Sequence, residues 1–289
     1  VFLNKLIGWK MRKKYLKYSD KTTYEVISAL TKNKELIKVL TGQYGDYGLA
    51  PKQSSFAMHA AVVKHYFHGG SFPIGGSSQI VETINPIISE AGGAIVISAD
   101  VKEIIIDNNK AIGVLMADGK SFYSDIIISG TGVINTFKKL IPQAVSKKHG
   151  LLKKLKKIKP SVSHASLYIG LNGSPEALKL PKTNLWIYPE KDDHDTLVSN
   201  YTKDINAPFP VVYVSFPSAK DPDWSNRYPN KSTIDIITLL PFDVFSNWEG
   251  SKWMKRGDDY EALKERISQR LFSELFKQLP HLKNAIDCY

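Results

Sequence analysis

The chain has little of what marks secreted or membrane-spanning proteins. Its single cysteine, Cys288, cannot form a disulfide within the chain, so a reducing, cytoplasmic compartment is the default expectation. No apolar run approaches the roughly 18 residues of a membrane span, and no secretory signal is recognisable. The sequence begins with Val1 rather than Met, which suggests an engineered segment, a processed product or a partial gene.

Common nucleotide-binding motifs are also missing. Gly75-Gly76 is not followed by the Gly-Lys-Ser/Thr of a P-loop. Gly130-Thr131-Gly132 nearly fits the dinucleotide fingerprint, but Asn135 replaces the third small residue, and no acidic residue lies between positions 126 and 175 to hold a ribose. Two interpretations stay open for this turn: a simple helix start, or a direct phosphate contact.

Metal ligands are sparse as well. His59, His65 and His68 lie close together, but no Cys, Asp or Glu stands between Asp46 and Glu82 to join them. Metal sites usually bring more ligands together at closer spacing. We therefore predict no metal site, and expect these histidines either to be hydrogen-bonded parts of the fold or, for His65 and His68, to line a ligand cavity.

What the chain does have is an ordinary globular composition with an excess of positive charge. The 289 residues are 43% hydrophobic and 23% charged, enough for one large or two ordinary domains. The net charge is +11, and Lys138–Lys159 holds nine lysines and no acid. Because no arginine or aromatic residue is interleaved there, we predict a solvated linker helix and no nucleic-acid partner, with anionic-lipid contact as the alternative.

Periodicity predicts a mixed set of elements. Helices are expected at 4–18, 24–40, 53–67, from Ser77 or Ser78 to Ala91, and at 258–279. The basic helix 4–18 is expected to pack Leu6, Trp9, Tyr15 and Leu16 on a core, with a membrane-surface contact as the alternative. Strands are expected at 94–97, 101–106, 111–117 and 120–123, with Asp118-Gly119 as a hairpin turn and Ile126–Ile128 as a central parallel strand. A separate, mainly antiparallel sheet is expected from 162–171, 185–188, 211–216 and 232–240.

Several ordered motifs resemble one family. They are Tyr47-Gly48, the F-P-x-G-G-S-S loop at Phe72–Ser78, Ala91–Ala94, Val101, Ser129-Gly130, the block Ser215–Trp224 with Arg227, and Lys255–Tyr260. The series is similar to flavoproteins of the phytoene-desaturase and carotenoid-isomerase group, and within it to the retinol-saturase branch. The resemblance covers roughly residues 20 to 284.

The resemblance implies an α/β fold with an α+β mix. It consists of part of an FAD-binding domain of the two-dinucleotide type and a substrate domain with helices and a mainly antiparallel sheet. The implied division is 1–68 for the helical part of the substrate domain, 69–145 for the central part of the FAD-binding domain, 146–258 for the antiparallel-sheet substrate domain and 259–289 for a helix returning to the FAD-binding domain. The family's G-x-G-x-x-G turn and its last flavin-contacting segment have no counterpart here, so the chain is expected to be an internal portion of such an enzyme.

The implied activity is hydride transfer between FAD and a carbon–carbon double bond of an apolar polyene. Val101, Ser129 and Gly130 match cofactor-binding positions; Pro73, Gly75, Gly76 and His68 match positions near flavin and substrate. Ile74 departs from the basic residue that relatives often carry there. Trp186, Tyr188, Tyr168, Tyr213 and Phe216 are candidates to line a substrate tunnel or to pack in the core. No catalytic residue is predicted, and the alternative function is a non-catalytic apolar-ligand or membrane-surface binding module.

Overall fold

The computed structural model describes residue 13 and residues 15–158 and 162–289. The chain divides into two compact units: Val1–Ile80 together with Val162–Tyr289, and Val81–Ser161. Each unit has its own sheet, so the prediction of two separate sheets is confirmed. The fold is mixed α/β, and every pairing between its strands is antiparallel.

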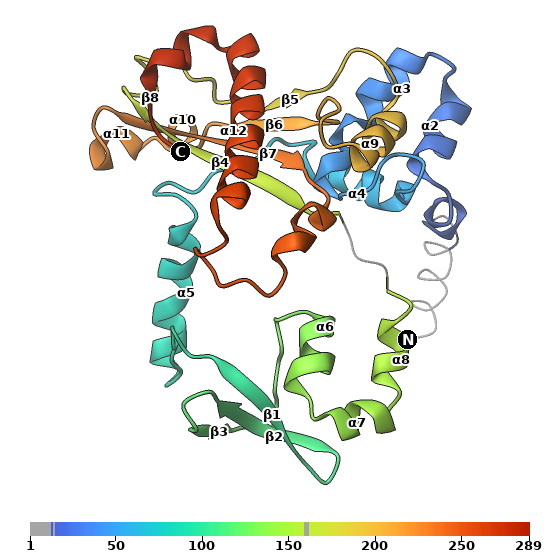
Figure 1. Cartoon of the computed structure of the whole chain (residues 1–289), viewed down its shortest axis with the longest axis vertical. Coiled ribbons are helices and arrows are strands. Elements are labelled where there is room, and N and C mark those ends of the chain that lie inside the picture. Colours follow the sequence, from blue (N-terminus) through green and yellow to red (C-terminus); the bar gives the residue numbers. More distant parts are fainter. Residues whose placement is uncertain (1–12, 14, 159–161) are drawn as a thin grey trace. The chain divides into compact units, whose positions relative to one another are not determined.

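A five-stranded sheet forms the centre of the first unit (Figure 1). Its strands are β4 (His164–Asn172), β5 (Leu185–Ile187), β6 (Val212–Ser215), β7 (Lys231–Leu239) and β8 (Ile286–Cys288), in the order β5-β6-β7-β4-β8. The predicted antiparallel sheet is thus confirmed, and β8 adds a strand that the sequence did not suggest.

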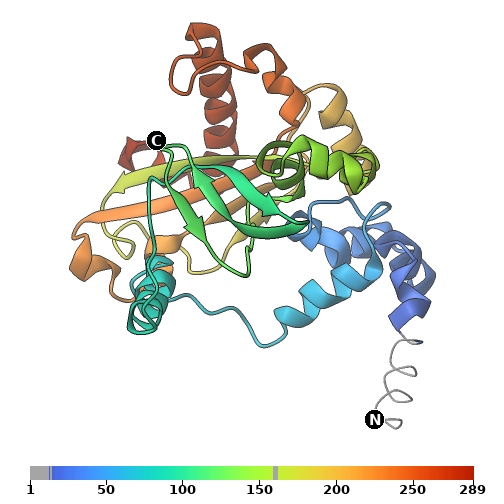
Figure 2. The ribbon, with the colours of Figure 1, turned by 90° about the horizontal axis from the view of Figure 1, so that it is seen from below.

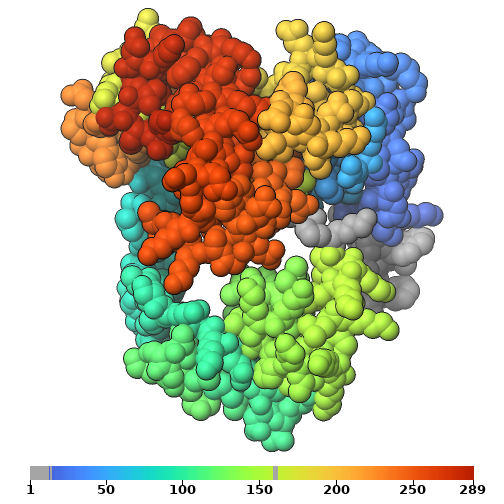
Figure 3. Space-filling model, viewed as in Figure 1, coloured from blue at the N-terminus to red at the C-terminus, as the bar shows by residue number. Residues whose placement is uncertain are grey.

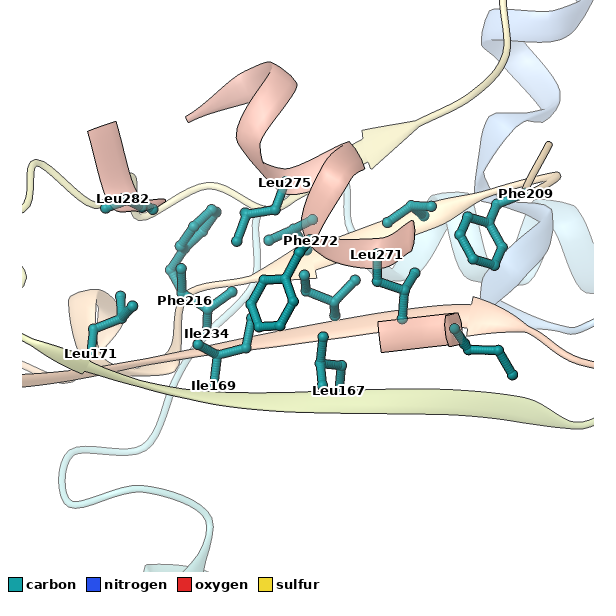
Figure 4. Close-up of a cluster of buried hydrophobic side chains, with 14 of the residues drawn as sticks. Leu167, Ile169, Leu171, Phe209, Phe216, Ile234, Leu271, Phe272, Leu275 and Leu282 are labelled. Carbon is teal, nitrogen blue, oxygen red and sulfur yellow. The ribbon is translucent and has the colours of Figure 1, made fainter. Parts of the chain in front are cut away.

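One long helix covers the inner face of this sheet. Helix α12 (Asp258–Gln278) begins with Asp258, Asp259 and Glu261 in its first turn, where the helix dipole favours acidic side chains. Its buried residues Ile267, Leu271, Phe272 and Leu275 pack against inward-facing strand residues. Figure 4 shows this cluster; its strand members include Leu167, Ile169, Leu171, Val212, Val214, Ile234 and Ile236. The last helix was expected to return to the FAD-binding domain; in the structure it packs on the sheet of the first unit instead. An amphipathic stripe predicts that a helix face is buried but not which surface buries it.

Shorter helices complete the first unit. They are α2 (Thr23–Leu30), α3 (Lys34–Thr41), the 3-10 turn η1 (Gly42–Asp46), α4 (Phe56–His65), α9 (His194–Lys203), α10 (Pro217–Lys220), α11 (Trp224–Arg227), η3 (Phe242–Trp248) and η4 (Pro280–Ala285). The single helix expected at 24–40 is two helices, because Asn33 caps a new helix start by accepting the N–H of Leu36. Thr22 and Glu25 form a capping box at the start of α2.

The second unit contains a three-stranded antiparallel sheet of β1 (Val101–Asp107), β2 (Lys110–Met116) and β3 (Ser121–Tyr123). Helix α5 (Ser78–Glu90) leads into it, and α6 (Val133–Asn135), the π-helical turn η2 (Thr136–Leu140), α7 (Gln143–Lys148) and α8 (Leu151–Leu155) follow it. The hairpin turn at Asp118-Gly119 is confirmed, with Gly119 at φ +88°.

Two predicted strands of this unit do not form. Residues 94–97 and Ile126–Ile128 lie outside any strand of the described chain, and Ile97 and Ile128 are 82% and 90% exposed. The apolar run predicted a buried strand, but a strand also needs a neighbour to pair with its N–H and C=O groups. The apolar side chains Ile80, Ile84 and Ile87 of α5 are likewise exposed.

The predicted basic helix 4–18 falls largely outside the described residues. Within the described part, Tyr15 and Leu16 are helical but exposed, so they do not pack on a core as expected. In the described part of the chain, no helix combines the length and the apolar character that crossing a membrane requires.

Candidate ligand site

The five-stranded sheet has a second face that α12 does not cover. Side chains alternate across a strand, so the inner residues of β4 and β7 are buried while His164, Ser166 and Ile237 lie on the outer face. A pocket of about 410 Å³ opens on this face. It is lined by Gly45, Asp46, His164, Ser166, Trp186, Val211, Tyr213, Ile237, Thr238 and Leu239.

Aromatic side chains form one wall of this outer-face pocket. The Trp186 and Tyr213 rings meet edge to face with their centroids 4.8 Å apart. Gly45 permits this packing, because a Cβ at that position would lie 2.8 Å from a ring carbon of Trp186. A mostly apolar, aromatic wall with a few polar groups is the usual make-up of a small-molecule site.

Two tyrosine hydroxyls fix the segment that carries Gly45 and Asp46 in the sheet unit. Tyr44 is fully buried and donates its hydroxyl to the carbonyl of Pro210 at 3.3 Å. Tyr188 donates to the carbonyl of Gly42. Burial raises the pKa of both phenols, the Tyr44 pKa well above its ordinary value. They therefore remain protonated donors, and the position of η1 over the pocket is determined by buried contacts.

The structure places the five aromatic residues expected at a tunnel or in the core in four different settings. Trp186 and Tyr213 line the outer-face pocket. Phe216 is fully buried in the inner core, so it does not line it. Tyr188 packs against Tyr44 and His194, and Tyr168 is exposed on the outer side of β4.

The glycine loop between α4 and α5 is held by a buried carboxylate. Figure 2 shows the segment from α4 to the start of α5 as an extended connection. Within it, the Gly75 N–H donates to the two carboxylate oxygens of Asp221 at 3.1 and 3.2 Å. The Asp221 side chain is only 1% exposed and forms an ion pair with Arg227. The loop is therefore anchored to the sheet unit through a contact 146 residues apart in sequence.

The protonation of Asp221 follows from these contacts. Burial by itself raises the pKa of a carboxyl. The N–H groups of Gly75 and Asp223 and the guanidinium of Arg227 outweigh that effect and lower the pKa of Asp221 below its usual value. The residue is thus an ionised clamp. Asp221 and Arg227 stood among the family motifs, but nothing in the sequence linked them to Gly75.

The other residues predicted near flavin and substrate are placed as follows. Gly75 and Gly76 have φ values of +91° and +85°, a conformation that favours glycine. A Cβ on Gly75 would lie 2.9 Å from Gln79, whereas nothing lies within 4 Å of a Cβ on Gly76. Pro73 is half-buried, and His68 is exposed just beyond α4. The roles assigned to these residues stay predictions.

The predicted cofactor residues lie in the second unit. Val101 begins β1 opposite Met116. Ser129 forms hydroxyl hydrogen bonds with Thr131 at 3.1 Å and Thr136 at 2.7 Å, and Gly130 beside it is exposed. Exposed hydroxyls on a glycine turn fit contacts to a ribose or phosphate, but the described residues contain no glycine-rich strand-to-helix turn for a pyrophosphate. Contact of Val101, Ser129 and Gly130 with FAD stays a prediction.

A metal site is absent from the part of the chain that the structure describes: no three His, Cys, Asp or Glu side chains are grouped to hold an ion. His59 is buried and its Nδ1 forms a hydrogen bond with the Tyr47 hydroxyl at 3.0 Å. Burial lowers the pKa of His59. This histidine is a neutral, hydrogen-bonded member of the fold.

Comparison with known proteins yields relatives along nearly the whole chain, although no protein-family model matches it. It is 34% identical over 281 residues to all-trans-retinol 13,14-reductase of Danio rerio and 33% identical over 280 residues to that of Homo sapiens; each alignment covers 94% of this chain and 46% of the relative. A Danio rerio protein named inactive all-trans-retinol 13,14-reductase is 31% identical. Prolycopene isomerase of Arabidopsis thaliana is 28% identical over 77% of this chain.

Among solved structures, an oxidoreductase from Methanosarcina mazei has the same fold, with a TM-score of 0.58 over 84% of this chain and 53% of that one, at 20% identity. The chain spans about half the length of the curated relatives it matches. The resemblance seen in the motifs is confirmed: the chain is similar to all-trans-retinol 13,14-reductases over 94% of its length and to a prolycopene isomerase over 77%.

Proposed function

We propose that the chain is part of an FAD-dependent oxidoreductase that acts on a carbon–carbon double bond of an apolar polyene. The observation that carries the proposal is the outer-face pocket, whose aromatic wall of Trp186 and Tyr213 suits an extended apolar ligand. The relatives' names, retinol reductase and prolycopene isomerase, supply the polyene class. Both retinol and carotenoids are apolar conjugated chains, so one pocket type serves either.

The division of roles follows the two units. Trp186, Tyr213 and Ile237 would bind and orient the polyene in the first unit, while Gly75, held by Asp221, would fix the loop that carries Pro73 and Gly76. Val101 and the Ser129-Gly130 turn would contact FAD in the second unit. When bound, the flavin supplies the hydride acceptor or donor. The residue ranges assigned above to substrate and FAD-binding domains are part of this proposal, apart from 259–289, whose helix α12 packs on the five-stranded sheet.

The same proposal holds that the chain is an incomplete part of the enzyme. It spans about half the length of its relatives. Most apolar residues of the runs at 94–97 and 126–128, namely Ile95, Val96, Ile97, Ile126 and Ile128, are exposed in the described chain, although their composition suits a buried strand. We therefore expect purified chain to bind FAD weakly or not at all. Dialysis against buffer followed by a visible absorbance spectrum measures this, and stoichiometric flavin would contradict it.

Polyene binding tests the function directly and needs no flavin. Purified chain is titrated with all-trans-retinol, followed by the quenching of tryptophan fluorescence. Trp186→Ala and Tyr213→Ala should each weaken binding, because each removes part of the pocket wall. Trp253→Ala is the matched control, since Trp253 is 79% exposed and lies outside the pocket. Equal affinity in all three variants would contradict the proposed role of the pocket.

A second function is favoured by a specific observation: a relative bearing the name of an inactive reductase is 31% identical to this chain. In that case the chain would bind an apolar ligand without catalysing a reaction. Surface contact with a membrane belongs to this alternative. The eight described lysines between Lys138 and Lys157 are all exposed, and among the described residues none of them forms an ion pair.

Four of these lysines lie in α7 and α8, at the surface of the second unit (Figure 3, light green). Val133, Ile134 and Ile158 are exposed close by in sequence. Lysines beside apolar groups favour anionic lipid, and the attraction should weaken with added salt. Co-sedimentation with phosphatidylserine vesicles, compared with phosphatidylcholine vesicles and with the Lys153→Glu/Lys154→Glu variant, measures this contact.

A further inference from the structure

The outer-face pocket contains a carboxylate that no contact of the fold explains. Asp46 ends η1 and lines the pocket, yet its side chain has no hydrogen-bond or ion-pair partner among the described residues. It is the sole carboxylate among the residues that line this pocket. Structural carboxylates elsewhere in the same unit, such as Asp221 and Asp193, accept backbone N–H groups and pair with cations.

The position of Asp46 is determined by its neighbours. Tyr44, two residues earlier, is fully buried, and the N–H groups of Tyr47 and Gly48 donate to its carbonyl at 3.3 and 2.9 Å. Burial raises the pKa of both Tyr188 and Tyr213, and the charge of the nearby Asp46 raises each further. The backbone at Asp46 is thus fixed beside the apolar wall, while its exposed side chain has no part in the packing of the fold.

Its surroundings favour a ligand hydroxyl over water. Asp46 remains exposed to solvent, but partial desolvation by the protein raises its pKa. An apolar ligand along Trp186 and Tyr213 would remove more of that solvent. The carboxylate would then need a hydrogen-bond donor from the ligand, since a buried charge without a partner is unfavourable.

We propose that Asp46 accepts a hydrogen bond from a terminal hydroxyl of the polyene, so that the pocket selects polyene alcohols over polyene hydrocarbons. This inference rests on the proposed function, which places a polyene in the same pocket. Sites built to bond a hydroxyl discriminate strongly against analogues that lack it, because the polar group of the site is left without a partner. The names of the relatives include both an alcohol, retinol, and a hydrocarbon, prolycopene, so the choice between them is a real distinction within the family.

Two other polar residues of the pocket, Thr238 and Ser166, fit the role less well. Thr238 already donates its hydroxyl to the carbonyl of Val211 at 2.6 Å. Ser166 is an uncharged group on β4, and hydrogen bonds to charged groups are the stronger ones. Ser166→Ala is therefore a useful control within the pocket.

The test compares two ligands that differ by one oxygen atom. All-trans-retinol and its hydrocarbon analogue, with a methyl group in place of the CH2OH group, are titrated into the purified chain by tryptophan fluorescence quenching. We expect the alcohol to bind about tenfold more tightly, the factor that corresponds to about 1.4 kcal/mol. In Asp46→Ala the two affinities should become equal, through weaker binding of the alcohol. Asp46→Asn, which keeps one acceptor oxygen, should retain part of the preference.

Controls separate the two hypotheses. Asp243→Ala removes an exposed carboxylate outside the pocket and should leave both affinities unchanged. Trp186→Ala should weaken both ligands. If the wild-type chain binds both ligands equally, or if Asp46→Ala keeps the preference, the role of Asp46 is refuted while the pocket stands. If neither ligand binds, the proposed function fails and the inference fails with it.

Discussion

Replacing Asp221 with alanine should loosen the glycine loop and destabilise the sheet unit at the same time. The side chain is 1% exposed and accepts the N–H of Gly75 at 3.1 Å, the N–H of Asp223 at 3.0 Å and a guanidinium N–H of Arg227. Removing one member of a buried, hydrogen-bonded ion pair typically costs 3–5 kcal/mol. Because the Arg227 side chain is 33% exposed, we expect the low end of that range, roughly 3 kcal/mol.

Chemical denaturation measures this loss as a lower transition midpoint. For a domain of this size, roughly 3 kcal/mol corresponds to a melting temperature lower by about 6–12 °C. Asp223→Ala is the matched control. Asp223 also pairs with Arg227, at 3.2 Å, but its side chain is 41% exposed, so its removal should cost less than about 1 kcal/mol.

The pH dependence gives an independent readout. The folded-state pKa of Asp221 is lowered, so its contribution is fully present above the unfolded value of about 4 and is lost as the pH falls through the folded value. Asp221→Ala should therefore flatten the acid side of the stability curve. Hydrogen exchange at the Gly75 amide should also become faster. A loss below about 1 kcal/mol with unchanged exchange at Gly75 would refute the clamp.

Other predictions follow from the same structure. Gly76→Val should abolish turnover of the complete enzyme yet lower the melting temperature by only a few degrees. Gly76 has φ +85° and nothing lies within 4 Å of the added Cβ, so the cost is that of a left-handed valine, about 1–2 kcal/mol. Full activity of this variant would show that the loop is only structural. Burial lowers the pKa of His59, so below about pH 6.5 the unfolded chain binds a proton that the folded chain does not, and the unfolding free energy should fall with the pH. Urea titrations of His59→Asn should show a smaller dependence of the unfolding free energy on pH. Ile236→Ala, on the buried face of β7, should lower the free energy of unfolding by about 2–5 kcal/mol. Ile237→Ala, on the pocket face, should weaken retinol binding with little loss of stability. Equal losses of stability would contradict the assignment of one face to the core and the other to the pocket.

Local sequence signals predicted elements where local physics decides them. Asp118-Gly119 between alternating apolar residues predicted the β2–β3 hairpin, and apolar residues at helical spacing predicted a helix at 258–279, where α12 forms. The break between α2 and α3 was missed, although Asn33 is a good N-cap residue and could have indicated it. Periodicity alone predicted one continuous helix, because apolar residues continue at helical spacing on both sides of Asn33.

Structural features that depend on a partner distant in sequence could not be predicted. The apolar run Ile126–Ile128 satisfied the pattern of a central strand, but a strand exists only with its hydrogen-bonded neighbours. The contact between Gly75 and Asp221 spans 146 residues, and no spacing rule connects them. Asp46 was missed for the same reason: it became interesting only when β6 and β7 placed Tyr213 and Ile237 in one pocket with it.

The location of the pocket follows from how the sheet unit distributes its apolar side chains. Helix α12 packs on the inner face, where Val214, Ile234 and Ile236 are fully inaccessible, so stability is concentrated there. The outer face keeps half-buried aromatic and aliphatic side chains that contribute less to the core. Segments anchored from elsewhere, η1 through Tyr44 and the glycine loop through Asp221, lie at fixed positions on the unit. Side chains on the outer face can therefore change, and with them the ligand contacts proposed there, without a change in the core that specifies the fold.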